Sequence, residues 1–364
     1  MDTLTLCGWS AFQWHRIPPL VRMLYLSGIE DDAPLVDLLD PDEGPLLGGI
    51  DYPLRVLAPD INHKPHREGV AIPHLSGIAS RQRPHRICRG LYVTDLLVTL
   101  LMLSRDLSVE RMALACSELC GRYSVFKPSQ DVQMLLDQID RGDLSDFGDL
   151  AEDILLEQRH GWQQARDPSG RPTSLWKRPA MLSRQAIEDF ISSLPSRTRG
   201  KNQLGKALGL MVENTASPLE TMAAILLGQP RRRGGEGIGQ PMCNLEIPLS
   251  SEARRIAGQG TCYGDLCFRK QDGGMLDIEC HSKTWHAGSL KTMSDMERAT
   301  ALECMGVEVL FLTDGQLKDS AQAAEIARVA RKKLGITQPD PSVKLLARRD
   351  ALRREILVDW QTFT

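Results

Sequence analysis

The chain has 364 residues, which is long for one domain and short for three. Hydrophobic residues make up 42% and charged residues 25%, as in an ordinary globular protein with at least one sizeable core. The formal net charge of -3 excludes an overall basic protein, so any surface for nucleic acid must be local.

The cysteines indicate a reducing compartment. There are nine of them, scattered and without a Cys-x-x-Cys pair, which argues against a disulfide framework. Cys116 and Cys120 lie four residues apart without a second ligand pair at zinc-site spacing, so a structural zinc is not expected. No signal peptide pattern and no run of 18 apolar residues occurs, and we expect a cytoplasmic protein without a membrane partner.

The first 125 residues predict a small α+β domain. A helix is expected over 20–26, followed by an acidic stretch from Glu30 to Glu43 that is typical of a solvated surface. Strands are expected over 54–57 and 87–92, and then two helices. The first helix is capped by Thr94 or Asp95 and runs to residue 103, and the second runs from Ser108 to Cys120.

Residues 126–203 predict a connector that is mainly helical. The spacing of apolar residues predicts helices over 130–139 and 150–158, and the segment 167–172 reads as a turn. After residue 196 the composition becomes basic. Seven basic residues indicate either a solvated linker or a rim that faces the phosphates of DNA: Arg197, Arg199, Lys201, Lys206, Arg231, Arg232 and Arg233.

Residues 204–336 predict a second α/β domain. Ser217-Pro218-Leu219-Glu220 begins a helix, with Ser217 at the N-cap and Glu220 at the third helical position, so Glu220 has a structural role available in a capping box. Strands are expected over 244–248, 264–268 and 275–280, with a hairpin turn at 271–274. A strand over 307–313 and a helix over 321–334 follow, and residues 337–364 predict a C-terminal helix.

The predicted hairpin brings carboxylates together. Asp277 and Glu279 share one face of the returning strand because side chains alternate along a strand. Asp265, on the preceding antiparallel strand, can meet Glu279 at one cation. Mg²⁺ prefers oxygen ligands, and one or two carboxylates suffice to hold it.

This pattern resembles the PD-(D/E)XK nuclease superfamily, and the segment Glu279 to His286 resembles its Vsr-like branch. Asp295-Met296-Glu297-Arg298 is similar to the Asp-x-x-Arg of that branch, and five anchors follow one another in order over about 130 residues. The resemblance implies a restriction-endonuclease-like mixed sheet flanked by helices and Mg²⁺-dependent hydrolysis of DNA. It also implies roles for seven residues, namely Glu220, Asp265, Glu279, His281, Lys283, His286 and Arg298.

Within the resemblance, Asp265 and Glu279 hold the metal, and Glu220 binds it through water. His281 positions or deprotonates the attacking water, with Lys283 on the same strand face as a substitute. His286 and Arg298 support the phosphate or the carboxylates.

The chain departs from the branch where Asp and Gly are replaced by His281 and Ser282. The alternative is therefore a catalytically degenerate regulator of the antitoxin type that binds DNA or a partner protein. The N-terminal region weakly resembles proteins related to abortive-infection antitoxins, in 54–57, 90–94, the helix to Leu103 and 118–123. This resemblance implies a regulatory or DNA-contacting role for the first domain.

Overall fold

A computed structural model describes residues 3–27, 49–51, 53–57, 70–71, 83–167, 169–281 and 289–363, with the backbone alone for 70–71 and 289–296. The acidic stretch from Glu30 to Glu43 lies outside the described residues. By the contacts between its residues, the chain divides into two compact units. Unit 1 comprises residues 1–107, 124–165 and 173–205, and unit 2 comprises residues 108–123, 166–172 and 206–364.

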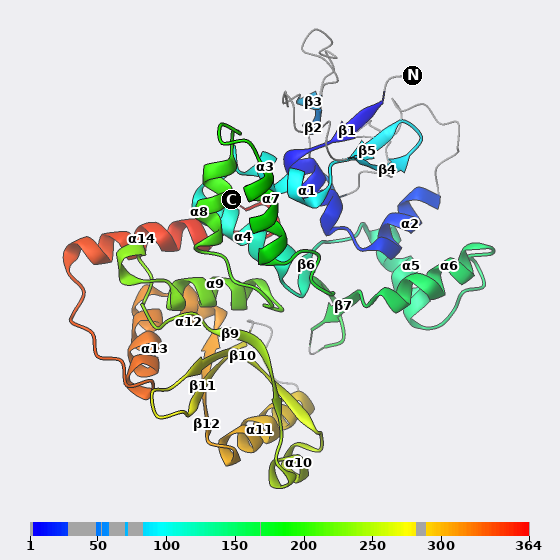
Figure 1. Ribbon diagram of the computed structural model, residues 1–364. Coiled ribbons are helices and arrows are strands. Elements are labelled where there is room, and N and C mark those ends of the chain that lie inside the picture. Colours follow the sequence, from blue (N-terminus) through cyan, green and yellow to red (C-terminus); the bar gives the residue numbers. More distant parts are fainter. Residues whose placement is uncertain are drawn as a thin grey trace. The chain divides into compact units, whose positions relative to one another are not determined.

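Unit 1 contains a five-stranded mixed sheet with the strand order β3-β2-β1-β5-β4 (Figure 1). Its strands are β1 (Leu4–Leu6), β2 (Leu54–Leu57), β3 (Val70–Ala71), β4 (His85–Cys88) and β5 (Leu91–Val93). The single strand expected over 87–92 was wrong, because β4 and β5 are separate and pair antiparallel. Gly90 lies between them with a φ of 78°, a conformation that glycine adopts without steric cost and that lets the chain reverse.

The helices of unit 1 supply most of its buried apolar side chains. They are α1 (Gly8–Arg16), α2 (Pro19–Ser27), α3 (Leu96–Leu103), α5 (Gln130–Asp140), α6 (Leu150–Glu157), the 3-10 helix η3 (Gln158–His160) and α7 (Arg184–Ser193). Asp95 caps α3 by accepting hydrogen bonds from the N–H groups of Leu97 and Val98, as one of the two expected caps. Trp14, Phe126 and Trp176 lie in the core.

The segment expected to be a helical connector also contains strands. A three-stranded sheet has the order β6-β8-β7, formed by β6 (Tyr123–Val125), β7 (Gln163–Arg166) and β8 (Pro172–Lys177). The expected turn over 167–172 joins β7 to β8, where Asp167 Oδ1 accepts hydrogen bonds from the N–H groups of Ser169 and Arg171. Helix α8 (Lys201–Leu208) follows and crosses the border between the two units.

Unit 2 contains a four-stranded mixed sheet with the order β12-β11-β10-β9. The strands are β9 (Met242–Pro248), β10 (Thr261–Arg269), β11 (Met275–His281) and β12 (Val307–Thr313). Its helices are α4 (Val109–Cys120), α9 (Pro218–Gly228), η4 (Arg231–Arg233), α10 (Ser251–Ala257), α11 (Ser289–Cys304), α12 (Asp314–Lys318), α13 (Ser320–Lys333) and α14 (Val343–Ile356). Helix α4, expected in the N-terminal domain, is grouped with this unit.

The strand pairing confirms the expected mixed α/β architecture with helices around the sheets. β9, β10 and β11 are antiparallel neighbours, with the β10–β11 turn at 270–274. β11 and β12 are parallel, and α11 forms the crossover between them, because parallel strands need such a connection. Figure 1 shows α9 on one side of this sheet and the paired helices α10 and α11 on the other.

Helix α9 is buried along almost its whole length. Every residue from Leu219 to Gly228 is buried, and its sequence is apolar all round except in the first turn. A helix of this kind must lie inside the unit, so its N-terminus is carried into the interior together with Glu220.

Candidate active site in unit 2

Glu220 lies in the first turn of α9 and is 6% exposed. Ser217 caps the helix: its Oγ accepts a hydrogen bond from the Glu220 N–H (3.2 Å) and donates one to Glu220 Oε1 (2.8 Å). Glu220 Oε2 accepts from the N–H of Ala216 at 2.7 Å. The expected capping arrangement is present in a modified form, since the carboxylate reaches the N–H that precedes the cap.

Asn244 on β9 connects Glu220 to the sheet. Its Nδ2 donates to Glu220 Oε2 (2.9 Å) and to the carbonyl oxygen of Asn214 (2.8 Å). Asn244 has a φ of 47°, a conformation that asparagine adopts more readily than most residues. Asn244 could not be predicted from the sequence, because an asparagine at the start of a strand carries no signal of such a contact.

Asp265 on β10 and Glu279 on β11 are neighbours across the hairpin, as the sequence predicts. Leu266 pairs with Ile278, so the residues next to them, Asp265 and Glu279, come side by side. Asp265 Oδ2 accepts a hydrogen bond of 2.8 Å from the Cys280 N–H. The two carboxyl groups lie close enough to be joined by a hydrogen bond when one of them is protonated.

Asp277 adds a further carboxyl group, fully buried, to which the sequence analysis gave no role in the site. Its Oδ1 accepts a hydrogen bond from the Leu266 N–H (3.2 Å) and lies 3.6 Å from the Cys267 Sγ. The signal that could have identified it is its position two residues before Glu279, on the same strand. A methyl group at Gly264 would lie 2.8 Å from Asp277 Oδ2, so glycine is required for this packing.

The four carboxyl groups hold protons more tightly than in water. Burial raises the pKa of Glu220 to about 8 and that of Asp265 to about 6, with a smaller rise from neighbouring acids. Burial, followed by the charges of Asp265 and Asp277, raises the pKa of Glu279 to about 10. Burial also raises the pKa of Asp277. The cluster therefore favours any partner that adds positive charge.

Arg298 on α11 supplies positive charge to the cluster. Its Nη2 forms an ion pair with Glu279 Oε2, and its Nη1 donates a long hydrogen bond (3.4 Å) to the carbonyl oxygen of Tyr263. The structure thus brings together Glu220, Asp265, Glu279 and Arg298 of the residues that the sequence predicts. The side chain of Asp295, predicted to accompany Arg298, is outside the described part of the chain.

Three further predicted site residues follow Glu279. His281 ends β11, is 8% exposed, and its ring centroid lies 5.1 Å from that of Phe311. Lys283 and His286, together with Ser282, lie outside the described residues, so their predicted roles remain predictions.

The predicted DNA-binding residues are divided between the units. Arg197, Arg199 and Lys201 belong to unit 1, whereas Lys206 and the three arginines of η4 belong to unit 2. Lys206 and Arg232 are exposed. Arg233 Nη1 donates to the Gly209 carbonyl oxygen at 2.6 Å, so this nitrogen is already engaged in a contact within unit 2.

The donor chemistry of the cluster suits a hard divalent cation. Asp277 Oδ2 and Glu279 Oε1 are buried, and among the residues that the structure describes they have no hydrogen-bond partner unless a proton joins them to a neighbouring carboxyl group. Within the described ranges, no group of three or more His, Cys, Asp or Glu side chains is arranged to hold one ion. Two carboxylates completed by water are nevertheless sufficient for Mg²⁺, so Asp265 and Glu279 fit such an ion by their chemistry.

Comparisons with known proteins give no family for this chain. No family model, no curated protein and no solved structure matches it. In the described part of the chain, no helix combines the length and the apolar character needed to cross a membrane.

Proposed function

We propose that unit 2 hydrolyses phosphodiester bonds of DNA with the help of Mg²⁺, which Asp265 and Glu279 would hold. The observation that carries this proposal is the convergence of Glu220, Asp265, Asp277 and Glu279 from one helix and one hairpin. Buried acids placed against one another destabilise a fold unless protons or cations compensate them. A structural role alone gives no reason to gather four of them.

Each residue of the site has a proposed role. Asp265 and Glu279 would hold the cation, and the buried Asp277 would add negative charge to the cluster. Glu220 would bind the cation through water, and Asn244 holds the Glu220 carboxylate in place. Arg298 forms an ion pair with Glu279 and would also contact a phosphate oxygen. A divalent cation held there would supply Lewis-acid chemistry, namely polarisation of the phosphodiester and a lower pKa of the attacking water. His281, or Lys283 in its place, would position or deprotonate that water.

One observation favours a second candidate, a regulator that binds DNA or a partner protein without cleaving. Arg298 is paired with Glu279 Oε2, which is one of the oxygens that the cation would use. An ion pair in this position can replace the cation structurally. In that case the carboxylate cluster is the remainder of a site that has lost its activity.

A cleavage assay distinguishes the two candidates. The wild type is incubated with single- and double-stranded DNA in the presence of Mg²⁺ or Mn²⁺, alongside Asp265→Asn and Glu279→Gln. The matched control is Glu246→Gln, an exposed acid on β9 of the same sheet. We expect cleavage by the wild type and the control, and loss of cleavage with retained DNA binding in the two site variants, since metal ligands act mainly on the transition state. DNA binding without cleavage by the wild type would instead support the regulator.

A further inference from the structure

Two segments of unit 2 concentrate positive charge in a chain that is acidic as a whole. Residues 231–238 and 331–356 together contain eleven lysines and arginines and four acids, whereas the whole chain has a formal net charge of -3. The first segment contains η4, and the second contains the C-terminal end of α13 and the whole of α14. Such a local excess of positive charge favours a polyanion as the partner.

Glu236 joins the two segments. Its Oε2 forms ion pairs with Arg331 Nη1 (2.9 Å) and Arg349 Nη2 (2.5 Å), and the three side chains are at most 15% exposed. Burial lowers the pKa of Arg349, and the charges of Arg331 and Arg231 add to this effect while the charge of Glu236 opposes it. One carboxylate therefore compensates three neighbouring guanidinium groups, so this cluster keeps a net positive charge.

Gly234 brings η4 into direct contact with α14. A methyl group at Gly234 would lie 2.4 Å from the carbonyl oxygen of Arg348 and 3.1 Å from Leu352 Cβ. Gly234 also has a φ of 91°, a conformation that glycine adopts without steric cost. The contact therefore places η4 beside the turn of α14 that carries Arg348.

Exposed cations flank this contact. Lys344 and Arg348 are both exposed and lie one turn apart on α14, about 6 Å along the helix axis. Within the described part of the chain, neither side chain forms an ion pair or a hydrogen bond, and the same holds for Arg232 of η4 and Arg354 of α14. Cations without such partners can contact phosphates and release the counterions condensed on a nucleic acid, which drives association.

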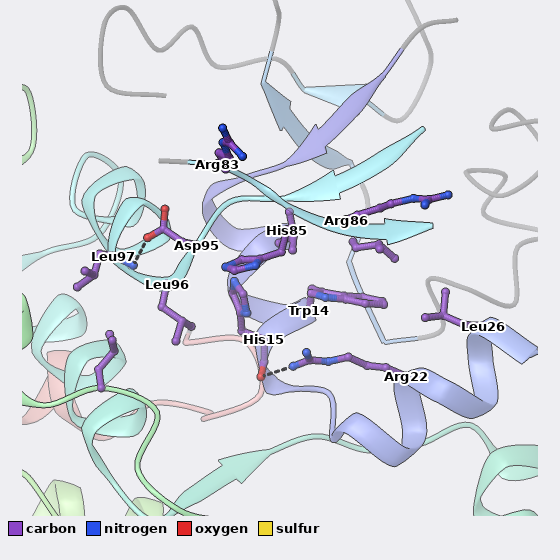
Figure 2. Close-up of a pocket in the computed structure, with 13 residues that line it drawn as sticks. Trp14, His15, Arg22, Leu26, Arg83, His85, Arg86, Asp95, Leu96 and Leu97 are labelled. Carbon is purple, nitrogen blue, oxygen red and sulfur yellow. Dashed lines mark hydrogen bonds between the residues drawn. The ribbon is translucent and has the colours of Figure 1, made fainter. Parts of the chain in front are cut away.

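The arginines of unit 1 are arranged differently. Arg22, Arg83 and Arg86 line a pocket formed by α1, α2, β4 and the start of α3, and Figure 2 shows their guanidinium groups apart from one another. These three arginines therefore do not form one site for an anion. The cluster around Glu236 differs because two of its guanidinium groups meet at a single oxygen atom.

The residue types of the two segments favour duplex DNA among the polyanions. The segments contain no aromatic residue, whereas proteins that bind single strands stack the bases on aromatic rings. A helix that lies on a membrane buries its apolar side in lipid, but Leu345, Leu352 and Ile356 of α14 are already buried in unit 2. The exposed Val343 and Leu346 are too few to anchor the helix in lipid. Duplex DNA presents about one phosphate charge per 1.7 Å of its axis, and contacts with phosphates do not require the bases.

We propose that residues 231–238 and 331–356 form a surface, called the α14 surface below, that binds the phosphate backbone of duplex DNA without regard to its sequence. The α14 surface shares no residue with the carboxylate cluster, and α9 leads from one to the other. Glu220 lies in the first turn of α9 and η4 follows its last turn, and the eleven residues of α9 span roughly 16 Å. The proposal rests on the proposed function for its partner, DNA, and adds where the duplex is held.

Fluorescence anisotropy titrations of the full chain test the proposal. The probe is a labelled duplex of about 20 base pairs, two turns of the double helix, in EDTA so that no cleavage takes place, at several salt concentrations. A single strand of the same sequence, a duplex of another sequence and vesicles of phosphatidylcholine with phosphatidylserine are the comparison ligands. The test variant is the double substitution Lys344→Ala and Arg348→Ala. The matched control, Arg255→Ala with Arg269→Ala, removes the same charge from two exposed arginines of α10 and β10.

We expect the test variant to bind the duplex at least about tenfold more weakly at low salt. The slope of log K against log salt concentration should fall by up to about 1.8, since each lost phosphate contact removes about 0.9. The control should change neither quantity, and both variants should keep the Tm of the wild type because they replace exposed side chains.

Three results would overturn the proposal: equal duplex binding by the test variant and the control, tighter binding of the single strand than of the duplex, or vesicle binding that the test variant loses. A difference of more than about tenfold between the two duplexes would also overturn it, because it would show that bases are read. Cleavage by the wild type in Mg²⁺ together with unchanged duplex binding by the test variant would remove the α14 surface alone. Duplex binding through the α14 surface without cleavage would remove the nuclease function alone.

Discussion

Asp265 Oδ2 accepts a hydrogen bond from the main-chain N–H of Cys280, the residue that follows Glu279 on the neighbouring strand. This contact holds the Asp265 carboxylate beside Glu279. Its donor is the main chain of β11 and not a side chain. One oxygen of Asp265 is thereby oriented by the backbone of the hairpin. The relationship ties the geometry of the proposed metal site to strand register, which is a rigid feature of the fold.

The first prediction concerns stabilisation by divalent cations. A ligand present at 100 times its Kd stabilises a folded protein by about 2.7 kcal/mol, which corresponds to a rise in Tm of roughly 5–10 °C for a unit of this size. We expect Ca²⁺ or Mg²⁺ to raise the Tm of unit 2 in the absence of DNA, as measured by scanning calorimetry. Asp265→Asn should abolish the rise and Glu246→Gln should retain it. An unchanged Tm at millimolar cation would contradict metal binding by this cluster.

The second prediction concerns Gly264, which lies beside Asp277. A methyl group there would lie 2.4 Å from the Cys267 Sγ and 2.8 Å from Asp277 Oδ2. Overpacking of this kind costs about 1–3 kcal/mol, so Gly264→Ala should lower the free energy of unfolding measured in urea. Gly260→Ala, in the bend just before β10 and with open space around the added methyl group, is the control and should change little. Equal stability of the two variants would show that the packing of Asp277 is loose.

The third prediction concerns DNA affinity and salt. Each phosphate contact by a basic residue contributes about 0.9 to the slope of log K against log salt concentration on duplex DNA. Lys206→Ala and Arg232→Ala, two exposed residues of unit 2, should each reduce this slope by up to about 1 in fluorescence anisotropy titrations. Arg328→Ala removes an exposed arginine that pairs with Glu325 and serves as the control. A slope that neither variant changes would place the DNA contacts elsewhere.

The fourth prediction concerns the pH dependence of unit 1. His15 Nε2 is 2.8 Å from the Thr94 carbonyl oxygen, and burial with the nearby charge of Arg22 lowers the pKa of His15 to about 3. The unfolded chain binds a proton at this position near pH 6.5, whereas the folded chain does not. The contribution of neutral His15 to the stability of the folded state is therefore fully present above pH 6.5, and it is lost as the pH falls towards 3.

By pH 5 the loss should reach about 2 kcal/mol, at 1.36 kcal/mol for each pH unit below 6.5. Hydrogen exchange of the α1 amides between pH 5 and 7, corrected for the intrinsic rate, measures it. His15→Gln should flatten this dependence, and His160→Gln, which replaces an exposed histidine of unit 1, should leave it unchanged. A wild-type profile as flat as that of His15→Gln would show that His15 accepts a proton in the folded state.

The sequence by itself determined the local elements of unit 2. Ser217 with Pro218 at the next position fixes where α9 begins, because the cap satisfies N–H groups of the first turn within the same segment. The glycine pair at 273–274 and the alternation in 275–280 determined the hairpin, and hence that Asp265 lies opposite Glu279. These features depend on residues that are close in the chain, so their causes are visible in the sequence.

Only the tertiary structure decided which groups complete each site. Asn244 reaches Glu220 across 24 positions, and Asp277 becomes part of the cluster because the fold buries its carboxyl group beside Leu266 and Cys267. In unit 1, Trp14 and Arg22 line the same pocket as Arg86 although they lie more than sixty positions away in the sequence. Such contacts arise from packing between distant segments, where the burial of each group sets its charge state, and no local pattern encodes that burial.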